Sequence, residues 1–139
     1  MCVSLVLWFK LLSLMYMKDM STFASQCSAS ALRRLRTITL TIQQQTSLKE
    51  WITDVTNLLE KSPLELFQIY SIGGFLDSTK ADDLWGPIVR SHREHLTRFS
   101  IHRMRISMAA IQTICTECTS LQELFVVVDP DSMVIYALL

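Results

Sequence analysis

The chain has 139 residues, the size of a single domain, and half of its residues are hydrophobic. Its 13 basic and 13 acidic residues balance, so no field of the whole chain draws it toward nucleic acid or anionic lipid. Four cysteines, at positions 2, 27, 115 and 118, are too few and too unevenly placed for a disulfide-stapled secreted module. We therefore expect a globular intracellular protein of the cytoplasm or nucleus.

An apolar segment at residues 3–17 opens the chain and is interrupted by two serines and Lys10. It is shorter than the ~20 residues needed to span a bilayer, and no basic region precedes it. We expect a buried helix, or the remainder of a preceding repeat, rather than a targeting or membrane segment. Residues 18–31 are small and polar, as in a linker. The sequence thus predicts an N-terminal helix and linker over 1–31 and a main domain over 32–139, with further repeats expected beyond its C-terminal end.

One short motif, Leu-x-x-Φ-x-Φ with Φ apolar, occurs four times in the main domain. Its leading leucines, separated by 29, 32 and 25 residues, are Leu35, Leu64, Leu96 and Leu121. These spacings lie in or near the period of about 20–29 residues of leucine-rich repeats, in which each unit supplies one strand and one helix. The repetition predicts one βα unit per copy.

Each copy begins a segment with the alternating apolar pattern of a strand. The predicted strands are Leu35–Ile42, Leu64–Tyr70, Leu96–Ile101 and Leu121–Val128. Between them, Ser47 and Glu50 match a capping box ahead of an apolar stripe. A second, shorter helix is predicted around Leu84 to His92, with Pro87 tolerated near its first turn.

A third helix is predicted after Ser107, a plausible N-cap, with Ile111, Ile114, Cys115 and Cys118 on its apolar stripe. The Asp-Pro-Asp-Ser sequence at 129–132 predicts a further helix start.

Strands that alternate with helices pair in parallel through right-handed crossovers. The predicted fold class is therefore α/β, either a curved solenoid with a parallel four-stranded sheet or an open doubly wound sheet. The same motif at the start of every strand favours the solenoid, in which each copy occupies an equivalent position.

The four motif copies, with Ile114-Cys115-x-x-Cys118-x-x-Leu121 ahead of the last, resemble the degenerate leucine-rich repeats of fungal F-box proteins. The likeness covers about residues 32–136. It implies a substrate-receptor role, in which the repeats hold a protein target. An F-box elsewhere in the protein would dock onto the adaptor of an SCF-type ubiquitin ligase. We expect a non-catalytic interaction module with no cofactor and no nucleic-acid or membrane partner.

Side chains two, four and six residues after each leading leucine point away from the buried leucines, because side chains alternate between the two faces of a strand. Stacked in register, they form the concave face that we expect to bind protein. The residues are Thr37, Thr39, Thr41, Leu66, Gln68, Tyr70, Arg98, Ser100, His102, Glu123, Phe125 and Val127. Tyr70, Arg98 and Phe125 are of the types that concentrate binding energy in interfaces. Packing of this face under the apolar N-terminal segment is the alternative.

Another class of function remains open, a small α/β metal-binding protein or enzyme. Two histidines, His92 and His95, and two cysteines, Cys115 and Cys118, have the donor set of structural zinc. Buried, unmetallated cysteines are the simpler interpretation. Residues 90–105 contain five arginines, which we interpret as a solvated edge. The sequence has no Gly-rich phosphate loop and no nucleophile elbow, so we do not expect an enzyme.

Overall fold

The computed structural model describes residues 11–14, 32–43, 47–72, 82–129 and 133–138. Within these ranges the chain forms six strands and three helices. In chain order they are β1 (Leu11–Leu14), β2 (Thr37–Gln43), α3 (Leu48–Leu59), β3 (Leu66–Ile72), α4 (Asp82–His92), β4 (Arg98–Arg105), α5 (Met108–Glu117), β5 (Glu123–Asp129) and β6 (Met133–Leu138). The predicted alternation of strands and helices is confirmed from β2 to β5.

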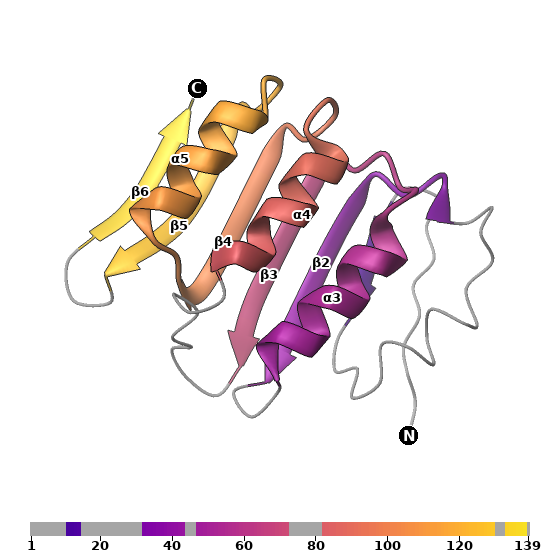
Figure 1. Ribbon diagram of the computed structural model, residues 1–139, viewed down its shortest axis with the longest axis horizontal. Helices are drawn as coiled ribbons and strands as arrows, with labels where there is room; N and C mark the ends of the chain where they lie inside the picture. Colours follow the sequence, from indigo (N-terminus) through magenta and orange to yellow (C-terminus); the bar gives the residue numbers. More distant parts are fainter. Residues whose placement is uncertain (1–10, 15–31, 44–46, 73–81, 130–132, 139) are drawn as a thin grey trace.

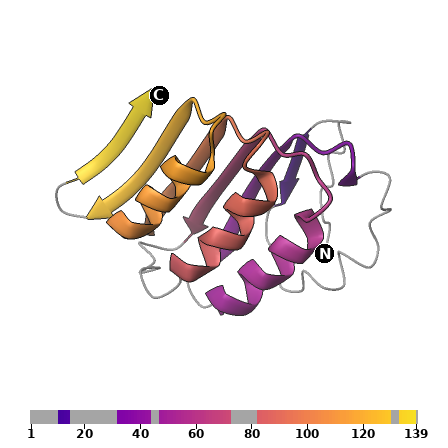
Figure 2. The ribbon, with the colours of Figure 1, turned by 45° about the horizontal axis from the view of Figure 1, so that its top comes forward.

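All described strands belong to one sheet, in the order β1-β2-β3-β4-β5-β6. Strands β1 to β5 pair in parallel, and β6 pairs antiparallel with β5. Helices α3, α4 and α5 lie side by side on one face of this sheet (Figures 1 and 2). Neighbours in the sheet are also neighbours in the chain, so the described sheet lacks the reversal of strand order that defines a doubly wound fold. Over the described residues, the strand order is therefore not that of a doubly wound sheet.

The pairing register places the four motif copies at equivalent positions. Residues two after each leading leucine pair across the sheet in the series Thr37, Leu66, Arg98 and Glu123. Their offsets along the chain, 29, 32 and 25 residues, equal the spacings between the leading leucines. The motif repeat of the sequence is therefore also a repeat of the structure.

The leading leucines are buried in the turn before each strand, so the strands begin two residues later than predicted. The apolar positions of the motif point beneath the helices and form one core. At its centre Phe67 and Phe99 are register partners whose rings stack, and Trp85 of α4 meets Phe99 edge-on at a centroid distance of 6.3 Å. Burial of aromatic rings of this size supplies much of the energy that holds helix to sheet.

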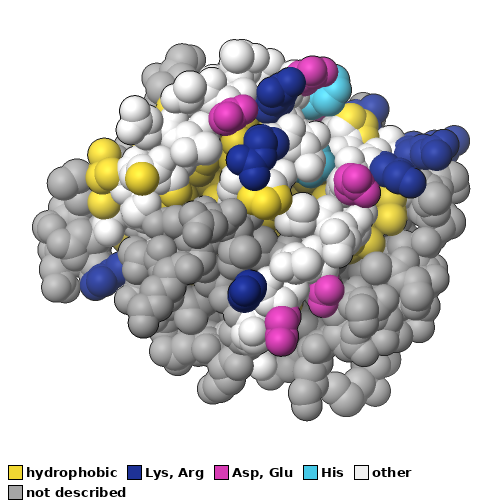
Figure 3. Space-filling model, viewed as in Figure 1, with side chains coloured by type: hydrophobic (Ala, Val, Ile, Leu, Met, Phe, Trp, Pro, Cys, Tyr) yellow, Lys and Arg dark blue, Asp and Glu magenta, His cyan; other side chains and the backbone are white. Residues whose placement is uncertain are grey.

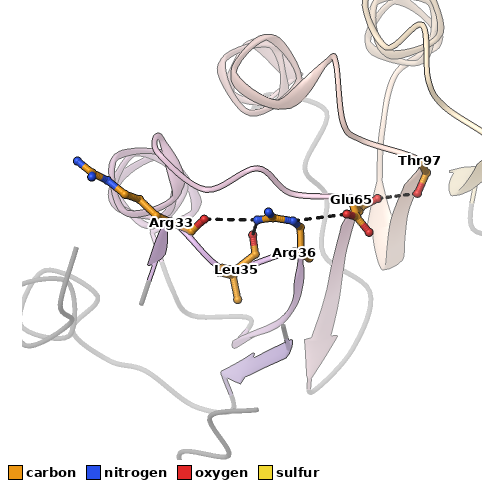
Figure 4. Close-up of polar contacts among 5 residues, drawn as sticks. All are labelled: Arg33, Leu35, Arg36, Glu65 and Thr97. Atoms are coloured by element: carbon orange, nitrogen blue, oxygen red, sulfur yellow. Dashed lines mark hydrogen bonds and ion pairs between the residues drawn. The ribbon is translucent and has the colours of Figure 1, made fainter. Parts of the chain in front are cut away.

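The same backbone hydrogen-bond pattern recurs at the residue that follows each of the first three leading leucines. The Arg36 carbonyl accepts from the backbone N–H groups of Glu65 and Leu66, and the Glu65 carbonyl accepts from those of Thr97 and Arg98. Side chains reinforce the pattern, since the Arg36 guanidinium lies 3.5 Å from the Glu65 carboxylate and the Thr97 hydroxyl donates to the Glu65 carbonyl (Figure 4). The carbonyl of Thr97 accepts equivalent bonds at the start of β5. This ladder fixes where each strand begins relative to its neighbour.

The helical expectation for residues 3–17 is wrong over the four residues described there. Leu11–Leu14 form β1, which pairs in parallel with Thr37–Leu40. The periodicity of a short apolar run does not separate a buried helix from a strand. Pairing with β2 gives the backbone of β1 hydrogen-bond partners, which favours the strand. The rest of 3–17, and the linker at 18–31, lie outside the described residues.

The predicted last helix is also wrong, because Met133–Leu138 form strand β6. The connection from β5 is too short for a parallel crossover, so β6 turns back antiparallel to β5. Asp, Pro and Ser favour turns as well as helix starts. The expected parallel four-stranded sheet is thus present, but β1 and β6 extend it.

The observed helix starts agree in part with the predicted ones. Ser107 caps α5, accepting a hydrogen bond from the Ala110 N–H at 3.1 Å. Ser47 precedes α3 as predicted but makes no side-chain capping bond, so the capping box does not form. Helix α4 begins earlier than predicted, at Asp82, which places Pro87 inside the helix rather than near its first turn. On α5 Cys115 is exposed and does not belong to the buried stripe.

Candidate functional site

Three rows of side chains cross the sheet face opposite the helices, two of them over β2 to β5 and the third over β2 to β4. We call this surface the helix-free face. The first row is Thr37, Leu66, Arg98 and Glu123; the second is Thr39, Gln68, Ser100 and Phe125; the third is Thr41, Tyr70 and His102. These side chains are half-buried or exposed, whereas the residues between them on β2 and β3 are buried. The structure therefore brings together the predicted concave-face residues, with one exception.

The exception is Val127, which is buried and pairs with Arg105 rather than with His102. The register between β4 and β5 shifts after Ser100, and Arg103 has a φ of 58°. A non-glycine residue with positive φ is uncommon and marks a bulge that turns the strand. The sequence signal is the three-residue step from Ile101 to Met104, which breaks the strand alternation.

Three aromatic rings stand side by side in the third and second rows. The ring of His102 lies between Tyr70, at 4.3 Å and 10°, and Phe125, at 4.4 Å and 23°. These distances are close to the spacing between strands, so the rings stand on the sheet with their edges outward. Both faces of the imidazole are covered, which leaves it no platform for a nucleic-acid base. The sequence predicted that His102 lies on this face, but not that its ring stands between the other two.

A chain of polar contacts runs along the same rings. The Thr39 hydroxyl lies 3.4 Å from Gln68 Oε1, and Gln68 Nε2 donates to the Tyr70 hydroxyl at 2.7 Å. The same Gln68 nitrogen is 3.2 Å from His102 Nε2, and the Ser100 hydroxyl is 2.8 Å from that ring nitrogen. Burial lowers the pKa of His102 below its ordinary value because desolvation disfavours the charged ring. The polar groups thus hold the aromatic rings in one arrangement.

Next to the rings, the first row ends in an ion pair. Arg98 Nη2 lies 2.9 Å from Glu123 Oε1, and both side chains are partly open to solvent. An exposed pair of this kind contributes little stability. The pair presents a donor fork and a carboxylate side by side at the surface.

The four residues of the alternative zinc site do not form a donor cluster. His92 is buried in α4, Cys118 is buried after α5, and His95 and Cys115 are exposed. In the part of the chain that the structure describes, no three His, Cys, Asp or Glu side chains are placed to hold a metal ion. Burial raises the pKa of Cys118 to about 11, with smaller contributions from Glu117 and Cys115, and a protonated thiol is a poor ligand or nucleophile.

Two surface hollows lie away from the helix-free face. One, of about 510 Å³, is at the beginning of β4 and β5 and is lined by Glu65, Thr97 and Gln122 among others. The second, of about 360 Å³, lies between α4 and α5 beside Trp85, Gly86 and Arg90. Over the helices, acidic and basic side chains are interspersed rather than gathered by sign (Figure 3). No described helix has the length and apolar character of a membrane span.

Comparisons with protein-family models, with curated proteins and with solved structures found no match.

Proposed function

We propose that this chain is a non-catalytic protein–protein interaction module that binds a protein target through the helix-free face. The observation that carries the proposal is the row of Tyr70, His102 and Phe125, held in place by Gln68 and bordered by the Arg98–Glu123 pair. Aromatic residues and arginine are enriched in interfaces, and tyrosine and arginine are among the types that concentrate binding energy there. A rigid row also loses little conformational freedom when a partner binds.

The shape of this face supports a protein rather than a small molecule as the ligand. Small-molecule sites are concave and enclose most of their ligand. The rows instead spread over four parallel strands. A surface of mixed aromatic, polar and charged side chains is typical of a protein interface.

The finer assignment is a leucine-rich-repeat-like solenoid serving as the target-recognition region of an F-box-type receptor. Its support is the equal register of the four motif copies, together with consecutive strand order and helices on one face. On this proposal the full-length protein docks onto an SCF adaptor through an F-box elsewhere, while the helix-free face holds the target. Co-precipitation of the adaptor with the full-length protein tests the assignment, and failure to recover it contradicts the F-box role.

Target binding itself is tested with two matched triple variants of the full-length protein. The face variant combines Tyr70→Ala, Arg98→Ala and Phe125→Ala. The control variant combines Lys49→Ala, Asn57→Ala and Gln112→Ala, which are exposed positions on α3 and α5. We expect a partner captured by the wild type to be retained by the control and lost by the face variant, with the circular dichroism of both unchanged. Equal capture by both variants contradicts the proposal.

A further inference from the structure

Gln68 is the hub of the polar contacts on the helix-free face. Its Nε2 atom lies 2.7 Å from the Tyr70 hydroxyl oxygen and 3.2 Å from His102 Nε2. An amide nitrogen carries two hydrogens and accepts none, so both contacts make Gln68 the donor. With the Gln68 amide in this orientation, His102 Nε2 accepts and the single proton of the neutral ring resides on Nδ1.

The Gln68 oxygen accepts at the other end of the same series of hydrogen bonds. Its Oε1 atom lies 3.4 Å from the Thr39 hydroxyl, which donates to it. The Ser100 hydroxyl, 2.8 Å from His102 Nε2, both donates and accepts, so it adapts to either state of the ring. Gln68 is different, because it exchanges donor for acceptor only by turning its amide group over. Which groups donate and which accept in these hydrogen bonds is therefore linked to the protonation state of His102.

The stacked rings hold the His102 imidazole in place, so the groups around it must adjust when the ring gains a proton. Tyr70 and Phe125 cover both faces of His102 at 4.3 and 4.4 Å, so the imidazole cannot rotate without breaking two stacks. A proton added at Nε2 meets the Ser100 hydroxyl, which can accept it at 2.8 Å, and the Gln68 amide nitrogen, which cannot, at 3.2 Å. Turning the Gln68 amide removes this unfavourable contact and presents Oε1 to His102 as a second acceptor. With the amide turned, the Tyr70 hydroxyl donates and the Thr39 hydroxyl accepts, so the hydrogen bonds of three strands are reversed.

We propose that the helix-free face binds its protein target with His102 neutral and releases it when His102 gains a proton, which reverses the Gln68 hydrogen bonds. This proposal rests on the proposed function, since it concerns regulation of the same surface. Protonation changes what the face offers a partner, because the Tyr70 hydroxyl becomes a donor within the face. It also adds a positive charge to a face that already carries Arg98.

The described surroundings of His102 contain few opposing charges. Strand β2 contributes threonines and Gln43 to this face, none of which titrates, and β3 contributes Tyr70 as its titratable group. Strand β4 itself carries Arg98, Arg103 and Arg105, and β5 carries Glu123, which is paired with Arg98. Burial keeps the pKa of His102 below its ordinary value, in agreement with a neutral ring at neutral pH.

Nuclear magnetic resonance of the isolated chain tests the inference without a partner. We expect the ring nitrogens of His102 to show a proton on Nδ1 at neutral pH. Gln68→Glu replaces the donor with a carboxylate and is expected to raise the pKa of His102. Gln68→Met, of similar size but with no hydrogen-bonding group, is expected to raise it less. A proton on Nε2 in the wild type, or the same His102 titration in all three proteins, overturns the inference.

Target binding gives the second measurement, using the partner captured by the full-length protein. We expect the wild-type affinity to fall about tenfold from about pH 7.5 to about pH 5.5, the effect of roughly one lost hydrogen bond. His102→Phe keeps an aromatic ring in the stack but has no proton to gain, so its affinity should be nearly constant over this range. Equal pH dependence in both proteins overturns the regulation while leaving the binding face intact. A target that binds independently of the Tyr70, Arg98 and Phe125 substitutions instead contradicts the proposed function.

Discussion

The rings of Phe67 and Phe99 stack at a centroid distance of 5.5 Å and an interplanar angle of 18°, as register partners on β3 and β4. Both are buried, and Trp85 closes the cluster from α4. Truncation of either ring leaves a cavity between sheet and helix. We expect Phe99→Ala to lower the free energy of unfolding by about 3–5 kcal/mol, measured by denaturant titration. Phe125→Ala, on the half-buried helix-free face, should cost less than half as much; equal losses would contradict this assignment of the core.

A second prediction compares the two serines that precede helices. Ser107→Ala removes the hydrogen bond to the Ala110 N–H and should destabilise the chain by about 1 kcal/mol. Ser47→Ala should cost at most a few tenths of a kcal/mol, because Ser47 makes no side-chain cap bond. Thermal or denaturant unfolding of both variants checks the difference. A larger loss for Ser47→Ala would show that its capping bond forms in solution.

The motif repeat was readable from sequence because it depends on local patterns. Alternating apolar residues identified β2 to β5, and the spacing of Leu35, Leu64, Leu96 and Leu121 fixed the pairing register. The two edge strands were not predicted. For Leu11–Leu14 and Met133–Leu138 the deciding factor is the neighbouring strand, and a short apolar run does not contain that information.

The helix-free face was predicted in composition but not in detail. Alternation placed Gln68, Tyr70, His102 and Phe125 on one surface, as the structure does. Which of them touch depends on side-chain conformation and on the bulge at Arg103, and both are set by tertiary packing. The same limit applies to Cys115, whose exposure depends on how α5 rolls on the sheet.

A third prediction concerns pH and His92. Burial lowers the pKa of His92 to about 4, from the ordinary 6.5; a backbone hydrogen bond with Ser62 opposes this, and the charge of His95 adds to it. Between these values the unfolded chain binds the proton more readily, so stability falls as pH falls from about 6.5 toward about 4. The full loss is roughly 3 kcal/mol.

Denaturant titration across this pH range checks the prediction. His92→Gln removes the titrating group and should flatten the curve, whereas His95→Gln, at an exposed position, should leave most of the slope. An unchanged slope in His92→Gln would assign the acid sensitivity to another group.

A fourth prediction limits the role of the Arg98–Glu123 pair. Although the two groups lie 2.9 Å apart, both remain partly exposed, so a double-mutant cycle with alanine should give a coupling in stability below about 1 kcal/mol. Added salt should reduce it further. A coupling well above this limit would make the pair a structural element rather than a feature of the binding face.

The most direct measurement of the central claim is photo-crosslinking from single positions of the full-length protein. A benzophenone amino acid at Phe125 places the reactive group in the aromatic row, and the same amino acid at Gln112 places it on the exposed side of α5. Irradiation of each protein with its captured partner should join the partner to position 125 and not to position 112. Crosslinking at position 112 alone, at both positions, or at neither would contradict binding through the helix-free face.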